Sequence, residues 1–178
     1  HTSLYLKDNI YLNHVQDLIF DDSGNYIYTL SRPDGWNSNI TYICKWATAT
    51  LVLETCNISD IKYGVALTYY DGEVFALQGG SVEAFWDGRT YVIALDESDL
   101  LVTGTDIMYN GGVSLYTHAY DINVDDSNGN IFIIYSDNFG RVRSYERQED
   151  GTYCLPSSCY TEFYTYANST SINLKGNY

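Results

Sequence analysis

Residues 14–28 read HVQDLIFDDSGNYIY, and residues 118–133 read HAYDINVDDSNGNIFI. Both segments contain an apolar run, an Asp-Asp-Ser turn with Gly and Asn, and a second apolar run, in the same order. A match of this length indicates an internal repeat. A weaker copy lies between them, where residues 65–77 read VALTYYDGEVFAL. The copies predict tandem structural units of about 50 residues.

The similarity extends to the flanks of these segments. Residues 2–14 (TSLYLKDNIYLNH) parallel residues 105–118 (TDIMYNGGVSLYTH), and residues 172–178 (INLKGNY) repeat the run that precedes the turn. We therefore expect an N-terminal strand arm over residues 1–13, followed by a single β domain over residues 14–178. The expected units of this domain are residues 14–56, 57–103 and 104–160, with a half repeat over residues 161–178.

Each unit is predicted to contain four antiparallel strands. The chain has 19 Tyr, 6 Phe and 3 Trp but only 2 Pro, a composition that suits pleated, half-buried strands. Asp, Asn and Gly supply the turns, and no long segment has a helical period. In the third unit the expected strands cover residues 121–124, 130–136, 141–147 and 152–159. The sequence therefore predicts an all-β protein.

Tandem four-stranded units resemble a β-propeller in architecture, although no family signature occurs at matching positions. Three units and a half close a ring only if residues 2–13 supply strands beside residues 172–178. The same unfinished edges can instead pair between molecules. A β-sandwich with duplicated hairpins and a donated N-terminal strand remains the alternative fold.

The composition excludes several partners. Nine Lys and Arg stand against 23 Asp and Glu, which gives a net charge of -14. Nucleic acid and anionic lipid would repel such a chain, so we expect no nucleic-acid partner. The apolar runs are only a few residues long, so we also expect no membrane span.

Several features favour export. The chain begins at His1 without a Met, as expected of a mature product whose leader has been removed. The four cysteines favour two local disulfides, Cys44 with Cys56 and Cys154 with Cys159, over other pairings or a zinc site. Asn-x-Ser/Thr sequons, at about the frequency expected by chance, make three asparagines candidate glycosylation sites: Asn39, Asn57 and Asn168. We therefore expect an extracellular or cell-surface glycoprotein.

Catalytic signatures are weak. No nucleophile motif or phosphate loop occurs, and the abundant carboxylates have no diagnostic spacing. Residues 21–23 and 121–126 contain clustered Asp and Asn that could bind calcium, but such residues usually satisfy their own turns. His1, with His14 or His118 as a second ligand, resembles the N-terminal copper site of lytic polysaccharide monooxygenases. We expect a protein without enzymatic activity, metal or cofactor, with a copper oxidase as an alternative.

Residues 133–146 resemble a blade of the fungal-type fucose-binding propeller lectins. This resemblance implies a sugar site formed by Arg143, Tyr145 and Glu146. The other units depart from the pattern, because residues 82–86 (VEAFW) contain no Arg and residues 40–44 (ITYIC) contain neither charge. A carbohydrate-binding propeller is therefore an alternative function, and a solvated strand face is the simpler interpretation of these residues.

The leading functional hypothesis is a non-enzymatic structural or adhesive surface component. Residues 2–13 contain the alternating apolar pattern of a strand, with Leu4 and Leu6 followed by Ile10 and Leu12. Such an arm could complete the sheet of a neighbouring copy and build a filament. This layout is similar to that of bacterial and archaeal filaments assembled by strand donation. The expected partners are copies of the chain itself and glycans.

Overall fold

The computed structural model describes residues 14–33, 40–58, 61–79, 89–110, 118–136, 140–153 and 160–164. In these ranges the chain forms three four-stranded antiparallel sheets, each made from four consecutive strands. The first sheet contains β1 (Val15–Phe20), β2 (Tyr26–Ser31), β3 (Tyr42–Ala47) and β4 (Val52–Asn57). The second contains β5 (Gly64–Tyr70), β6 (Glu73–Gln78), β7 (Arg89–Asp96) and β8 (Val102–Asn110). The third contains β9 (His118–Val124), β10 (Ile131–Ser136), β11 (Arg141–Tyr145) and β12 (Tyr160–Tyr164).

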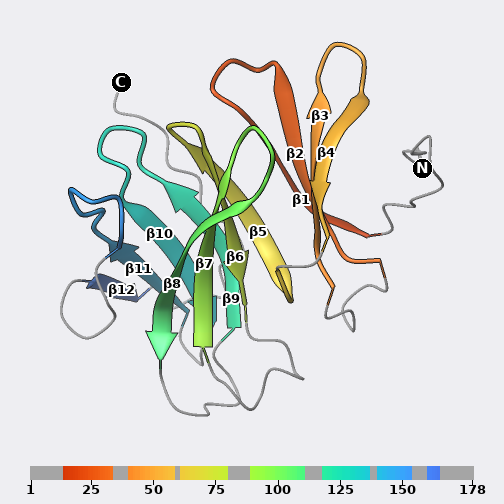
Figure 1. Cartoon of the computed structure of the whole chain (residues 1–178). Coiled ribbons are helices and arrows are strands. Elements are labelled where there is room, and N and C mark those ends of the chain that lie inside the picture. Colours follow the sequence, from red (N-terminus) through yellow and green to blue (C-terminus); the bar gives the residue numbers. More distant parts are fainter. Residues whose placement is uncertain are drawn as a thin grey trace.

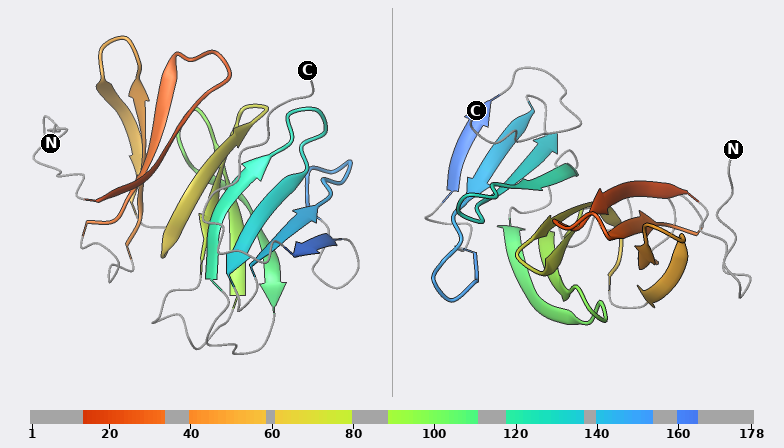
Figure 2. Two further views of the ribbon diagram at one scale, coloured as in Figure 1. Left: turned by 180° about the vertical axis from the view of Figure 1, so that it is seen from behind. Right: turned by 90° about the horizontal axis from the view of Figure 1, so that it is seen from above.

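The three sheets lie side by side in chain order. Figure 1 shows the first sheet at the right, the second in the centre and the third at the left, and the view from behind in Figure 2 agrees. The first strand of each sheet lies innermost, with β1 packed against β5 and β5 against β9. This arrangement confirms the propeller-like, all-β architecture and not the sandwich alternative.

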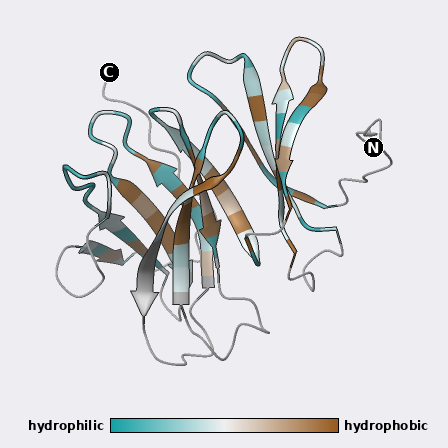
Figure 3. Ribbon diagram, in the orientation of Figure 1, coloured by the Kyte–Doolittle hydropathy of each residue, from teal (hydrophilic) through white to brown (hydrophobic). Residues whose placement is uncertain are grey.

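Two apolar cores hold the sheets together, and in Figure 3 the hydrophobic residues lie mainly on the strands. Between the first and second sheets, Tyr28 and Leu30 are fully buried against a set that includes Leu67. Between the second and third sheets, Phe75 and Leu77 belong to a cluster that contains residues from β9, β10 and β11. Because strand side chains alternate between faces, the second sheet contributes to both cores.

The repeated Asp-Asp-Ser segments form the turns between the first two strands of the first and third sheets. Asp21 accepts hydrogen bonds from the Ser23 hydroxyl and from Tyr26 N (2.9 Å). Asp125 accepts bonds from the backbone N–H and the hydroxyl of Ser127 (2.9 and 2.6 Å). These carboxylates thus satisfy their own turns, and the described part of the chain contains no cluster of three or more potential metal-ligating side chains.

The sheets differ from the expected strands and units in two places. In the third sheet the fourth strand is β12, whereas residues 152–159 were predicted to form it. Tyr153 makes only an isolated bridge to Arg147, and residues 154–159 lie outside the described residues. β8 runs across the expected boundary between units 57–103 and 104–160, so its last residues belong to the second sheet. The arm (residues 1–13) and residues 165–178 also lie outside the described residues.

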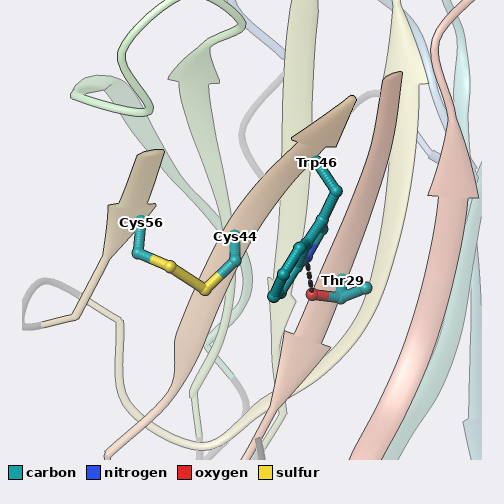
Figure 4. The surroundings of a disulfide bond; sticks show 4 residues. All are labelled: Thr29, Cys44, Trp46 and Cys56. Atoms are coloured by element: carbon teal, nitrogen blue, oxygen red, sulfur yellow. Dashed lines mark hydrogen bonds between the residues drawn. A yellow bond between two sulfur atoms is a disulfide. The ribbon is translucent and has the colours of Figure 1, made fainter. Parts of the chain in front are cut away.

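A disulfide joins Cys44 on β3 to Cys56 on β4, as predicted from the sequence. The two residues are direct cross-strand partners in the β3–β4 pairing. Figure 4 shows the bridge beside Trp46, whose Nε1 donates a hydrogen bond to Thr29 Oγ1 (2.9 Å). The other predicted pair, Cys154 with Cys159, lies outside the described residues.

A membrane-spanning helix is not found, because none of the described segments forms a helix of sufficient length and hydrophobicity.

Candidate functional site: a groove between the second and third sheets

The main candidate site is a groove of about 350 Å³ between the second sheet and residues 147–153, and we call it the interface groove. β6, β7 and β8 form one wall. The segment that follows β11 forms the other wall. The polar lining residues are Glu73, Thr103, Thr105, Arg147, Asp150 and Thr152.

Arg147 is the only basic residue in this lining, and its guanidinium connects the two sheets. Its Nη2 donates to Glu73 Oε2 at 3.0 Å, and the guanidinium lies 5.1 Å from the centre of the Tyr70 ring. Its backbone N–H donates to Asn130 Oδ1 (3.0 Å), which fixes the chain where it leaves the third sheet. Glu73 and Tyr70 therefore hold the side chain, and Asn130 holds the backbone.

One nitrogen of this guanidinium differs from the other two. Arg147 Nη1 is buried, yet it makes no hydrogen bond to any residue that the structure describes. A buried guanidinium N–H without an acceptor costs free energy. Because Nη1 is buried, a ligand in the groove reaches it only if the Arg147 side chain moves, whereas other atoms of this side chain, which is 18% exposed, are open to the groove.

The lining of the groove also contains a carboxylate in a tight turn, that of Asp150. The hydroxyl and the backbone N–H of Thr152 both donate to Asp150 Oδ1, at 2.7 and 3.0 Å. These bonds hold the pKa of Asp150 below its usual range, so the group is charged at neutral pH. The groove thus combines one cation, two acidic side chains and threonine hydroxyls, a set that recognises hydroxyl-rich ligands by hydrogen bonding.

The sequence-predicted sugar site is arranged differently from the expectation. Arg143 and Tyr145 do lie on one face of β11, but the acidic partner is Glu162 on β12, with Arg143 Nε 2.7 Å from Glu162 Oε2. Glu146 follows the strand and is exposed. The Arg143 side chain is only 7% exposed, and its guanidinium lies over the Tyr160 ring (4.5 Å). This arrangement is a packed internal network and not an open pocket.

The network has a defined protonation state. Burial raises the pKa of Tyr135 and of Tyr145, whose hydroxyls lie 3.0 Å apart, so both phenols are neutral. Burial would raise the pKa of Glu162, but hydrogen bonds from Tyr164 and Arg143 outweigh it and lower the pKa. Arg143 and Glu162 are therefore a charged pair at neutral pH, and they connect β11 to β12.

Of the predicted glycosylation sites and the candidate copper ligand, the structure describes only Asn57. Asn57 is 8% exposed and its Nδ2 donates to Leu100 O at 2.9 Å. Glycosylation at Asn57 stays a prediction. Asn39, Asn168 and the candidate copper ligand His1 lie outside the described residues.

Sequence reasoning missed Arg147 and Glu73. Arg147 lay at the end of an expected strand, and nothing nearby in the sequence distinguished it. Its partner is 74 positions away, so only the packing of the second sheet on the third brings the two together.

Comparison with known proteins supports the architecture alone. No protein-family model matches the chain, and no curated protein sequence matches it. Among solved structures, the chain is similar to the β-propeller domain of Myceliophteria thermophila Cps50 (Swd1), with a TM-score of 0.52 and 11% sequence identity. The match covers 85% of this chain and 39% of that domain, so the chain spans about two fifths of its length. The protein therefore has a β-propeller-like fold of three successive four-stranded sheets in its described part.

Proposed function

We propose that this protein is a non-enzymatic, extracellular adhesive component that binds carbohydrate in the interface groove. The observation that carries the proposal is the lining of the groove, in which the Arg147 guanidinium lies among threonine hydroxyls and two carboxylates. Sugar hydroxyls can accept from a guanidinium and donate to a carboxylate at the same time. The disulfide is typical of proteins in oxidising compartments and supports an exported protein.

The charges favour a neutral ligand over an anionic one. Glu73 and Asp150 outnumber Arg147 in the groove, and the whole chain has a net charge of -14. A phosphate or a sulfated glycan would be repelled by both the local and the overall charge. Neutral oligosaccharides are therefore the ligand class that fits best.

Gly104 allows a direct test. A Cβ added at this residue of β8 would meet only the Ala94 Cβ, at 3.9 Å, and both residues line the groove. Gly104→Val should therefore fill the groove with little distortion of the sheet. On a glycan array followed by calorimetry with the best neutral ligand, we expect this variant to bind roughly tenfold more weakly or worse.

The matched control is Thr161→Val, which places the same side chain on exposed strand β12 outside the groove. It should bind like the wild type. Full binding by Gly104→Val, or no binding of any neutral glycan by the wild type, would overturn the proposal. Binding that is lost with Arg143→Ala but kept with Gly104→Val would favour the network on β11 as the sugar site.

Assembly by strand donation stays a separate prediction. It depends on residues 2–13 and 172–178, which lie outside the described residues, and a deletion that tests it is described in the Discussion.

A further inference from the structure

The two end sheets each have one face that no other described sheet covers. In the first sheet, Tyr28 and Leu30 face the second sheet, so the alternate residues Leu18, Phe20, Ile27 and Thr29 face away from it. We call these alternate residues the outer face of the first sheet; Leu18 and Phe20 are its exposed part, because Thr29 is 2% exposed and accepts a hydrogen bond from Trp46. The outer face of the third sheet contains Phe132, Ile134, Val142 and Phe163, which are cross-strand neighbours on the side opposite the core. Ile134 is already buried (1% exposed), so the accessible part of this face is Phe163 with the half-buried Phe132 and Val142.

The internal repeat indicates that the outer face of the first sheet resembles a surface that packs against another sheet. In the aligned segments, Leu18 corresponds to Ile122 and Phe20 to Val124. Ile122 and Val124 are 2% and 4% exposed, because they pack in the core against the second sheet. Leu18 and Phe20 are 47% and 53% exposed. Among the residues that the structure describes, the first sheet therefore has the apolar residues of an inter-sheet contact but no sheet on that side.

The outer face of the third sheet has the complementary pattern. Asp17 on β1 accepts a hydrogen bond from Leu67 N (2.6 Å) and so joins the first sheet to the next one along the chain. Its repeat counterpart, Asp121, pairs with Ile134 in the β9–β10 ladder and thus lies on the outer face of the third sheet. Phe163, on the same face, is 53% exposed. This face has the residues that, in the first sheet, contact a following sheet.

We propose that the outer face of the third sheet docks on the outer face of the first sheet of a second copy of this chain. The docking would repeat the packing already present between the first and second sheets and between the second and third. Every copy has both halves of this contact, so one kind of molecule is sufficient. Two copies of three sheets, related by a two-fold axis, close a ring of six sheets, within the range of about four to eight found in propellers.

The test is the mass of the purified full chain in solution, by light scattering and sedimentation over a wide concentration range. We expect a dimer of twice the 20.2 kDa chain mass. Phe20→Glu and Phe163→Glu should each weaken the dimer by about tenfold or more, because each puts a charge into an apolar contact. Both side chains are about half exposed in the single chain, so the variants should keep the fold.

Leu101→Glu is the matched control, since Leu101 is 61% exposed in the turn before β8 and lies on neither outer face. It should dimerise like the wild type. Mixing Phe20→Glu with Phe163→Glu should restore a one-to-one dimer, because one of the two contacts then joins an unaltered first sheet to an unaltered third sheet.

A wild type that stays monomeric at all concentrations would overturn the proposal. Open-ended polymers would contradict ring closure. A dimer that is insensitive to Phe163→Glu would show that the third sheet is not part of the contact. Each of these results can be obtained without a glycan, so failure here is distinct from failure of the sugar-binding proposal.

Discussion

At the scale of single residues, two equivalent glycines have different roles. Both allow a turn with positive φ, but only Gly129 also leaves space for a residue of the groove. Gly24 and Gly129 lie in corresponding turns and both have positive φ, 69° and 74°. An added Cβ at Gly24 would meet nothing within 4 Å. At Gly129 it would lie 2.8 Å from Arg147 Cδ and 2.8 Å from Tyr70 Cε1. The absent side chain at Gly129 therefore leaves room for the arginine that lines the groove.

We expect both Gly→Ala substitutions to lower the free energy of unfolding by about 1–2 kcal/mol, because both force alanine into a left-handed conformation. Gly129→Ala should cost more, and it alone should weaken carbohydrate binding, since Arg147 must move. Urea unfolding and calorimetry measure the two effects. Equal losses of stability, with binding unchanged in both variants, would show that Gly129 does not position Arg147.

At the scale of elements, β12 is the strand whose attachment depends most on charge. It pairs with β11 alone in the third sheet, and its residue Glu162 forms ion pairs with Arg143 and Arg141. The pKa of Glu162 is held below its ordinary value in the fold, because hydrogen bonds from Tyr164 and Arg143 outweigh the effect of burial. A carboxylate with a lowered pKa stabilises the fold above its ordinary pKa, and this contribution is lost as the pH falls through the folded value.

We therefore expect the wild type to lose stability on acidification more steeply than Glu162→Gln, which has no such charge to lose. At neutral pH the variant should be less stable than the wild type, because Arg143 then lacks its charged partner. Urea midpoints at about pH 7 and about pH 3 provide the measurement. The control is Glu54→Gln, a change at an exposed carboxylate on β4. Parallel pH curves for wild type and Glu162→Gln would contradict this role.

At the scale of the whole molecule, the described sheets take none of their strands from the N-terminal arm (residues 1–13). Each described sheet already has four strands without any contribution from residues 1–13. We expect deletion of residues 1–13 to leave the sheets folded, with an unchanged circular dichroism spectrum, and to leave dimerisation through the outer faces intact.

Two other results would each identify a different role for the arm. Unfolding on deletion would contradict the expectation and indicate that the arm completes a sheet of its own chain. A folded monomer, in place of assemblies formed by the full chain, would instead support strand donation between molecules. Comparison with Phe20→Glu in the same sedimentation experiment distinguishes a donated strand from face-to-face docking.

The sequence alone determined the local features of this protein. Alternating apolar residues and Asp-Gly-Asn turns predict strands and hairpins, because both depend on neighbours within a few positions. The repeat located the first hairpin of all three sheets, and the Cys44–Cys56 bridge joins residues on adjacent strands of one sheet. The sequence misplaced the fourth strand of the third sheet, which is β12, whereas Tyr153 in the expected run makes an isolated bridge to Arg147.

Only the tertiary structure decided which charges meet. Arg143 pairs with Glu162 and not with nearby Glu146, because the β11–β12 register sets those two side chains opposite each other. Arg147 meets Glu73 because one sheet packs on another. Such contacts join residues far apart in the chain, and their energies depend on burial and on exact approach, neither of which a local pattern encodes. The interface groove and the two outer faces therefore became visible only once the sheets were in place.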